Sequence, residues 1–160
     1  MSGLEYVLAD LLRRKKLTIG TVESATGGLI SHLITNVPGS SDYFLGSIIS
    51  YSNELKVNLA GVRPESLEKY GAVSSQVAEE MAAGGRKTLR VDICIADTGI
   101  AGPGGATADK PVGLFYLGLA YKNETLSRKL LLRSGREENK RAAAEEALSW
   151  LCKYLGKTNS

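Results

Sequence analysis

The stretch Glu23-Ser24-Ala25-Thr26-Gly27-Gly28 lies between an apolar run, Leu17 to Val22, and a second apolar segment, Leu29 to Ile34. This pattern predicts a strand that turns sharply into a helix. Such a turn holds the Ser24 hydroxyl at a bend and directs free backbone N–H groups of the first helical turn into the same space. It suits a nucleophile beside an anion, or an oxygen next to a phosphate. An ordinary strand–turn–helix capped by Thr26 is the other interpretation.

Strand and helix patterns alternate on both sides of this turn. Before it, apolar residues at helical spacing predict a helix, and further helices are expected at residues 27–35, 53–59, 64–70, 75–89 and from about 136. Strands are expected at residues 17–22, 43–51, 91–96, 112–121 and 125–132, the last two as a hairpin. This order predicts an α/β fold, a three-layer α/β/α sandwich with a mixed, mostly parallel sheet, in a single domain over residues 1–160.

Composition narrows the class of protein. The formal net charge is +3 and the basic residues are scattered, so nucleic-acid binding is not implied. Cys94 and Cys152 are too few for a disulfide framework or a zinc site, and His32, the one histidine, leaves no His-rich metal site. No apolar run approaches the ~20 residues of a membrane span, and no signal peptide is visible. We expect a soluble, cytoplasmic protein with no membrane partner.

A second candidate group is Tyr51-Ser52-Asn53-Glu54-Leu55-Lys56, at the end of a predicted strand. A lysine near an apolar wall can have its pKa lowered enough to accept a proton. Lys56 is therefore a candidate base for Ser24, as in Ser-Lys hydrolases. The spacing does not match the Ser-x-x-Lys signature of penicillin-binding proteins, so the pair would have to form through space. The alternative is a solvated surface lysine and a half-buried tyrosine.

A third candidate group is the glycine-rich stretch Thr98 to Gly105, followed by Asp109-Lys110-Pro111-Val112-Gly113. Glycines after a strand let the backbone approach a ligand closely and expose N–H groups to it. The stretch is neither a Walker P-loop nor a Rossmann fingerprint. Arg136 could meet a phosphate or carboxylate with its planar guanidinium. The alternatives are a flexible surface loop and a solvated charge.

Taken in order, the motifs resemble the CinA C-terminal domain family, whose characterised enzymatic members are nicotinamide-nucleotide amidohydrolases. The resemblance covers roughly residues 4 to 155. The matching motifs are Glu23-Ser24-x-Thr26-Gly27-Gly28, Gly39-Ser40-Ser41, Tyr51-Ser52-Asn53-Glu54-x-Lys56, Gly61-Val62, Gly71-Ala72-Val73-Ser74, Gly99-Ile100-Ala101-Gly102-Pro103-x-Gly105 and Lys110-Pro111-Val112-Gly113.

The resemblance implies hydrolysis of the carboxamide of nicotinamide mononucleotide (NMN) to nicotinic acid mononucleotide and ammonia. It also implies an α/β/α sandwich that assembles as a homodimer and needs neither a metal nor a cofactor. The nucleotide-processing domain that precedes this one in long CinA proteins is not found in the sequence. We therefore expect a stand-alone amidohydrolase domain.

The same resemblance implies a role for each site residue. Ser24 would be the nucleophile, Lys56 its base, and Tyr51 would orient or relay protons. The oxyanion and substrate would be held by N–H groups of Thr26, Gly27 and Gly28 and of the turn at Thr98 and Gly99. The ribose phosphate would be bound by Gly102, Gly105, Lys110 and Arg136, although Lys110 could instead only brace its loop.

The sequence departs from the family pattern at the anion end of the site. Asp97 stands where an apolar strand residue is usual, and Gly135 where an aspartate usually precedes the arginine. These changes leave two alternatives open. One is a non-catalytic module that binds a pyridine nucleotide in a regulatory role. The other is an amidase for a different small amide, with Asp97 helping to select the substrate.

Overall fold

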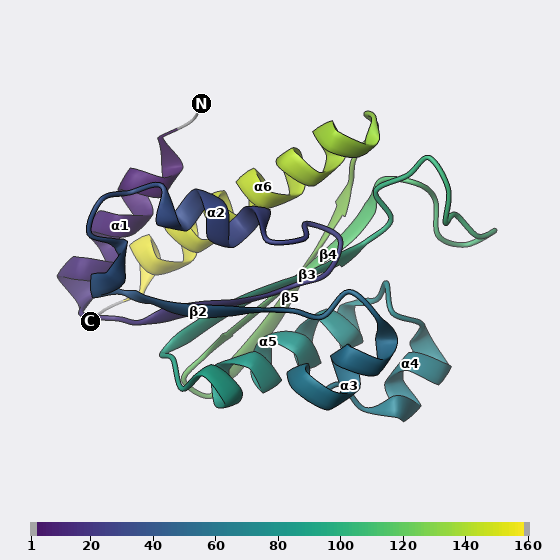
Figure 1. Cartoon of the computed structure of the whole chain (residues 1–160), viewed down its shortest axis with the longest axis horizontal. Coiled ribbons are helices and arrows are strands. Elements are labelled where there is room, and N and C mark those ends of the chain that lie inside the picture. The colour runs from purple at the N-terminus through teal and green to yellow at the C-terminus, as the bar shows by residue number, and fades with distance from the viewer. Residues whose placement is uncertain (1–2, 159–160) are drawn as a thin grey trace.

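The computed structural model describes residues 3–158 as a sheet between two layers of helices (Figure 1). One face of the sheet is covered by α1 (Leu4–Lys15), α2 (Leu29–Thr35) and α6 (Arg136–Lys157). The other face is covered by α5 (Ser75–Leu89), against which α3 (Asn53–Ala60) and α4 (Pro64–Tyr70) pack. A short 3-10 turn, Ser40–Asp42, precedes the second strand. The predicted three-layer α/β/α sandwich is confirmed.

The sheet of the described residues has five strands in the order β2-β1-β3-β4-β5. They are β1 (Ile19–Glu23), β2 (Phe44–Ile49), β3 (Ile93–Gly99), β4 (Leu114–Tyr121) and β5 (Glu124–Leu131). Strand β1 pairs in parallel with β2 and β3, whereas β4 is antiparallel to both β3 and β5. Only β4 therefore runs against the rest, so the prediction of a mixed, mostly parallel sheet is confirmed, and β4 and β5 form the predicted hairpin.

The first turn differs from its predicted boundaries for a backbone reason. The predicted helix 27–35 begins at Leu29, because Gly27 (φ +60°) and Gly28 (φ +106°) are in the left-handed region. A right-handed helix cannot include such residues, and glycine adopts this conformation at no steric cost. The two glycines thus serve the geometry of the turn.

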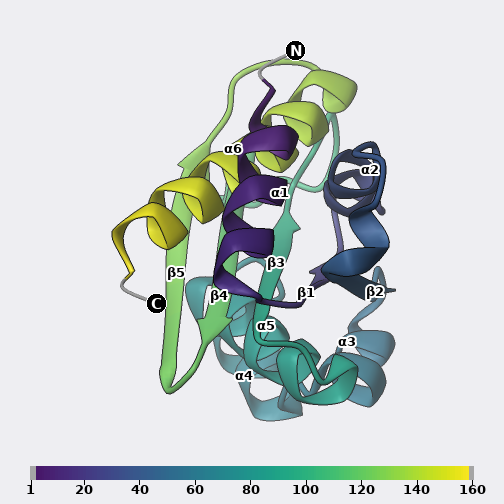
Figure 2. The same cartoon turned by 90° about the vertical axis from the view of Figure 1, so that its left-hand side faces the viewer.

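Close packing of α5 on the sheet fixes the second helical layer. A Cβ atom built on Gly118 of β4 would lie 2.0 Å from the carbonyl oxygen of Ala78 in α5. The absence of a side chain at Gly118 is therefore what lets the helix approach so closely. On the opposite face, α1 lies against α6 (Figure 2), over a larger apolar core.

The carboxyl ends of β1, β2 and β3 lie together at one edge of the sheet, because these strands are parallel neighbours. The loop of residues 100–113 projects from this edge, at the right of Figure 1. Ligands of open α/β sheets bind at such an edge. Within residues 3–158, no helix combines the length and the hydropathy that crossing a membrane requires.

Candidate active site

Ser24 is the first residue after β1, and a buried carboxylate holds its backbone in place. Asp97 of β3 is fully buried, and its Oδ1 accepts a hydrogen bond from the Ser24 N–H at 3.0 Å. Its Oδ2 accepts one from the Thr26 N–H at 3.1 Å. The Asp97 carboxylate thus points beneath the turn and not into the cleft.

A second buried carboxylate, Glu23, caps helix α2. Its Oε1 accepts the N–H groups of Gly28 (3.1 Å) and Ile30 (2.9 Å), and its Oε2 accepts that of Ser31 (2.9 Å). Three N–H groups that a helix start leaves unpaired are satisfied in this way. The Thr26 hydroxyl makes no capping bond to the helix and lies between the Glu23 and Asp97 carboxylates.

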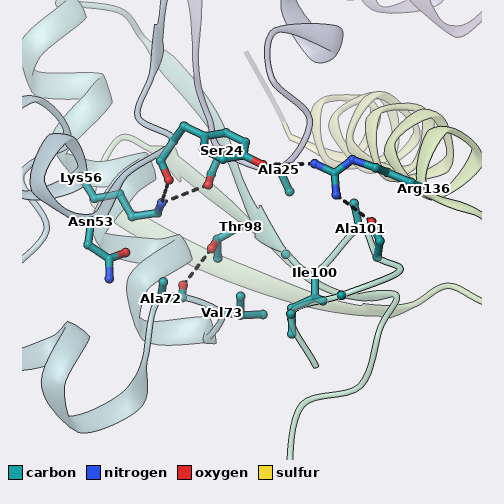
Figure 3. A pocket seen from close by; sticks show the side chains of 15 residues that line it. Ser24, Ala25, Asn53, Lys56, Ala72, Val73, Thr98, Ile100, Ala101 and Arg136 are labelled. Atoms are coloured by element: carbon teal, nitrogen blue, oxygen red, sulfur yellow. Dashed lines mark hydrogen bonds between the residues drawn. The ribbon is translucent and has the colours of Figure 1, made fainter. Parts of the chain in front are cut away.

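Lys56 comes from α3, which begins after the capping residue Ser52. Its side chain is almost fully buried, and its Nζ lies 3.0 Å from Ser24 Oγ. The Nζ also donates to the carbonyl oxygens of Ser50 (3.0 Å) and Tyr51 (2.9 Å). Two carbonyls therefore fix two of its hydrogens, and the third tetrahedral position of the nitrogen faces Ser24. Figure 3 shows the Lys56 side chain pointing toward Ser24.

The electrostatics of this pair favour a lysine that can act as a base. Burial lowers the pKa of Lys56, and the Asp97 charge raises it by a smaller amount. A neutral amine donates to both carbonyls and presents its lone pair to the Ser24 hydroxyl hydrogen. The group can then accept the proton that makes Ser24 nucleophilic.

A pocket of about 270 Å³ opens above Ser24 at the edge of the sheet. Of the site residues expected from the sequence, it is lined by Ser24, Tyr51, Lys56, Thr98, Gly99, Gly102, Gly105 and Arg136. The remaining lining residues are Ala25, Asn53, Ala72, Val73, Ile100, Ala101 and Gly104. The structure thus gathers all three candidate groups of the sequence around one cavity.

Arg136 lies on the far side of the pocket from Lys56 (Figure 3) and joins two of its walls. One guanidinium nitrogen donates to the carbonyl oxygen of Gly102 at 2.7 Å, and another donates to the Tyr51 hydroxyl at 3.2 Å. Tyr51 is 61% exposed at the rim, and its main-chain carbonyl is the part that contacts Lys56. The buried Asn139 amide donates to the carbonyl oxygen of Ala101 and so fixes the glycine-rich loop.

Four of the expected binding residues lie outside this pocket. Thr26, Gly27 and Gly28 face away from it and line a separate hollow with His32 and Lys140. The N–H groups of this turn donate within the protein, that of Gly27 to the Ser24 carbonyl. Lys110 Nζ donates to the Tyr70 carbonyl, which is the loop-bracing role.

Some residues of the site had no role in the sequence analysis. Glu23 and Asn139 are both buried and both make several hydrogen bonds to the backbone. The signal for Glu23 was available, because a carboxylate directly before a turn rich in N–H groups is a capping pattern. Asn139 departs from the family pattern, but the sequence did not show what it binds, since its partner Ala101 is 38 residues away. Within residues 3–158, no cluster of His, Cys, Asp or Glu could hold a metal ion.

Comparison with known proteins gives a consistent result. The family model of the CinA C-terminal domain matches residues 1–155 of the sequence. A CinA-like protein of Fusobacterium nucleatum is 51% identical over 146 residues, which are 91% of this chain and 35% of that protein. A CinA-like protein of Kosmotoga olearia is 48% identical over 153 residues, 96% of this chain and 37% of that protein. The chain therefore spans little more than a third of the length of these curated relatives.

A solved structure of similar length shows the same fold. The competence/damage inducible protein CihA from Agrobacterium tumefaciens superposes with a TM-score of 0.91 and 35% sequence identity. The match covers 98% of both chains.

Proposed function

Since the chain belongs to the CinA C-terminal domain family, we propose that it hydrolyses the carboxamide of NMN to nicotinic acid mononucleotide and ammonia. One observation carries this proposal above the others. A buried Lys56 amine lies 3.0 Å from Ser24 Oγ, in a pocket that a small ligand can enter. A lysine in that place has the position of a general base for a serine nucleophile.

In the proposed reaction, Ser24 Oγ attacks the carboxamide carbon while its proton passes to Lys56 Nζ. A tetrahedral intermediate forms, and the proton then moves from Lys56 to the amide nitrogen, which leaves as ammonia. Water attacks the acyl carbon of the resulting Ser24 ester and passes a proton to Lys56. Lys56 gives this proton to Ser24 Oγ as the bond between Oγ and the acyl carbon breaks and the acid is released. Each proton gained by Lys56 is thus returned, and no other titratable side chain is needed.

The oxyanion of the intermediate needs a nearby hydrogen-bond donor. The neighbouring N–H groups of Ser24, Thr26, Gly27 and Gly28 are all engaged within the protein. Among the described residues, none accepts the N–H of Ala25, and Ala25 lines the pocket beside the nucleophile. We therefore propose that the Ala25 N–H donates to the oxyanion, in place of the N–H groups of Thr26 to Gly28 expected from the sequence.

The glycine-rich loop and Arg136 are the proposed phosphate site. In residues 3–158, the N–H groups of Gly102, Gly104 and Gly105 have no acceptor in the protein, and all three residues line the pocket. Arg136 supplies the positive charge beside them. Backbone N–H groups with an arginine are a common way of binding phosphate.

A homodimer is part of the proposal. Strand β2 is an edge of the sheet, and its apolar Leu45 and Ile49 are exposed, as are Leu55 and Leu59 of the following helix α3. An exposed apolar edge is a typical protein contact surface. Light scattering should give twice the mass of the chain, and Leu45→Lys should shift the protein toward the monomer. A monomer at micromolar concentration would contradict this part.

Ammonia release from NMN tests the proposed activity, with Ser24→Ala as the variant and Ser127→Ala as the matched control. Ser127 lies in β5 and does not line the pocket. We expect turnover by the wild type and the control, and none by Ser24→Ala. Tight binding of NMN without ammonia release would favour the non-catalytic module. Turnover of another small amide, but not of NMN, would favour a different amidase, without selection by Asp97, which does not line the pocket.

A further inference from the structure

The Thr26 hydroxyl lies between two buried carboxylates and can satisfy only one of them. Its Oγ1 is 2.6 Å from Glu23 Oε1 and 2.5 Å from Asp97 Oδ1. A hydroxyl has one hydrogen to donate, and an ionised carboxylate has none. Both contacts are hydrogen bonds only if one carboxyl is protonated and donates to Thr26 Oγ1, while Thr26 donates to the other.

The surroundings place that extra proton on Asp97. Glu23 accepts three backbone N–H groups, whereas Asp97 accepts two, those of Ser24 and Thr26. Burial raises the pKa of Asp97 to about 6, and the Glu23 charge adds to the rise against the opposing hydrogen bonds. The complete chain of bonds then runs from the Asp97 carboxyl through the Thr26 hydroxyl to the Glu23 carboxylate.

Asp97 also connects this chain to both partners of the site. It holds the Ser24 N–H, and its charge favours the ammonium form of Lys56. The charged groups around it are Glu23 on β1 and Lys56 on α3, while α6 brings Lys140 to the outer side of the same turn. The protonation state of Asp97 therefore affects both Ser24 and Lys56, where the reaction would occur.

We propose that Asp97 is a positioning residue for Ser24, that it shares one proton with Glu23 through Thr26, and that losing this proton favours the protonated form of Lys56. This inference rests on the proposed amide hydrolysis. Asp97 touches no substrate and acts through the two residues that do. Its carboxyl is protonated below about pH 6, and the two Thr26 contacts are those of this protonated form. Above pH 6 Asp97 is an anion, so Thr26 donates to only one of the two carboxylates and the wild-type Lys56 works beside an anion at neutral pH.

The pH profile of kcat/KM for NMN separates this role from a merely structural one. In Asp97→Asn no anion forms, so Lys56 loses its proton more readily. We expect the acidic limb of the profile to move to lower pH than in the wild type, whatever happens to the maximum rate. A lower rate with an unmoved limb, or a limb moved to higher pH, would overturn the proposal.

Carbon-13 NMR of the aspartate carboxyls tests the shared proton in the resting protein, without substrate. The Asp97 signal, assigned by its loss in Asp97→Asn, should titrate near pH 6. Thr26→Val should move the midpoint downward, because it removes the oxygen that accepts the Asp97 proton, and Thr26→Ser should restore it. A wild-type midpoint near the ordinary 3.8, or one that Thr26→Val raises or leaves unchanged, would contradict the shared proton. If the wild type releases no ammonia, the proposed function fails. This titration still shows whether Asp97 and Glu23 share a proton.

Discussion

Replacing Glu23 by glutamine should destabilise the protein through the start of α2. The side chain keeps its shape, but one of its two acceptor oxygens becomes an NH₂ donor. If that donor takes the Oε2 position, the Ser31 N–H is left unpaired, and in the Oε1 position those of Gly28 and Ile30 are left unpaired. Since Glu23 is fully buried, water cannot replace the lost acceptor.

The magnitude follows from counting these bonds. One buried N–H without an acceptor costs about 1–3 kcal/mol. The two remaining N–H bonds change from charged to neutral acceptors and lose roughly 1 kcal/mol each. We therefore expect Glu23→Gln to lower the free energy of unfolding by about 3–5 kcal/mol. That is a large share of the ~5–15 kcal/mol of a typical domain.

Urea unfolding followed by far-UV circular dichroism measures this difference. The matched control is Glu68→Gln, an exposed glutamate in α4 with no hydrogen bond to the described residues, which should stay within about 0.5 kcal/mol of the wild type. A Glu23→Gln protein as stable as that control, with an unchanged m value, would refute the capping role.

Three further outcomes follow from the structure. Lys56→Met should reduce kcat for NMN by about 10²-fold or more, the usual size of general-base catalysis. The control Lys129→Met, on the exposed side of β5, should leave kcat unchanged. Equal rates for the two variants in steady-state ammonia assays would refute the role of Lys56 as the base. Arg136→Ala should raise KM for NMN by about tenfold or more, from the loss of a charged hydrogen bond, and an unchanged KM would remove Arg136 from the phosphate site. Gly118→Ala should lower the free energy of unfolding by about 1–3 kcal/mol or more, because the added methyl would meet a carbonyl of α5, and an unchanged urea midpoint would contradict that contact.

The fold was largely predictable because its signals are local. Alternation of strand and helix patterns predicted the layers, and the short connection between the predicted strands 112–121 and 125–132 predicted the hairpin. The start of α2 was predicted two residues early, since the left-handed backbone of Gly27 and Gly28 is not visible in an apolar pattern. The order of strands in the sheet is set by contacts between distant segments and could not be predicted from periodicity.

The site was predictable in its residues more than in its contacts. Ser24 and Lys56 were expected to pair through space, and the structure brings their side chains to 3.0 Å. The N–H groups of the turn were expected to point into the pocket. They instead donate to the buried carboxylates of Glu23 and Asp97. Where a side chain such as Asp97 points depends on the strand pairing, which residue identity alone does not give.

Lys56 can serve as the base for Ser24 only if it loses its proton in the folded protein. Carbon-13 NMR of the lysine side chains, with the Lys56 signal assigned through its absence in Lys56→Arg, measures this directly. We predict that the Lys56 signal titrates below the ordinary lysine value of 10.5, because burial lowers its pKa. A midpoint at or above 10.5 would mean that Lys56 remains an ammonium group at neutral pH, and would contradict its role as the base for Ser24.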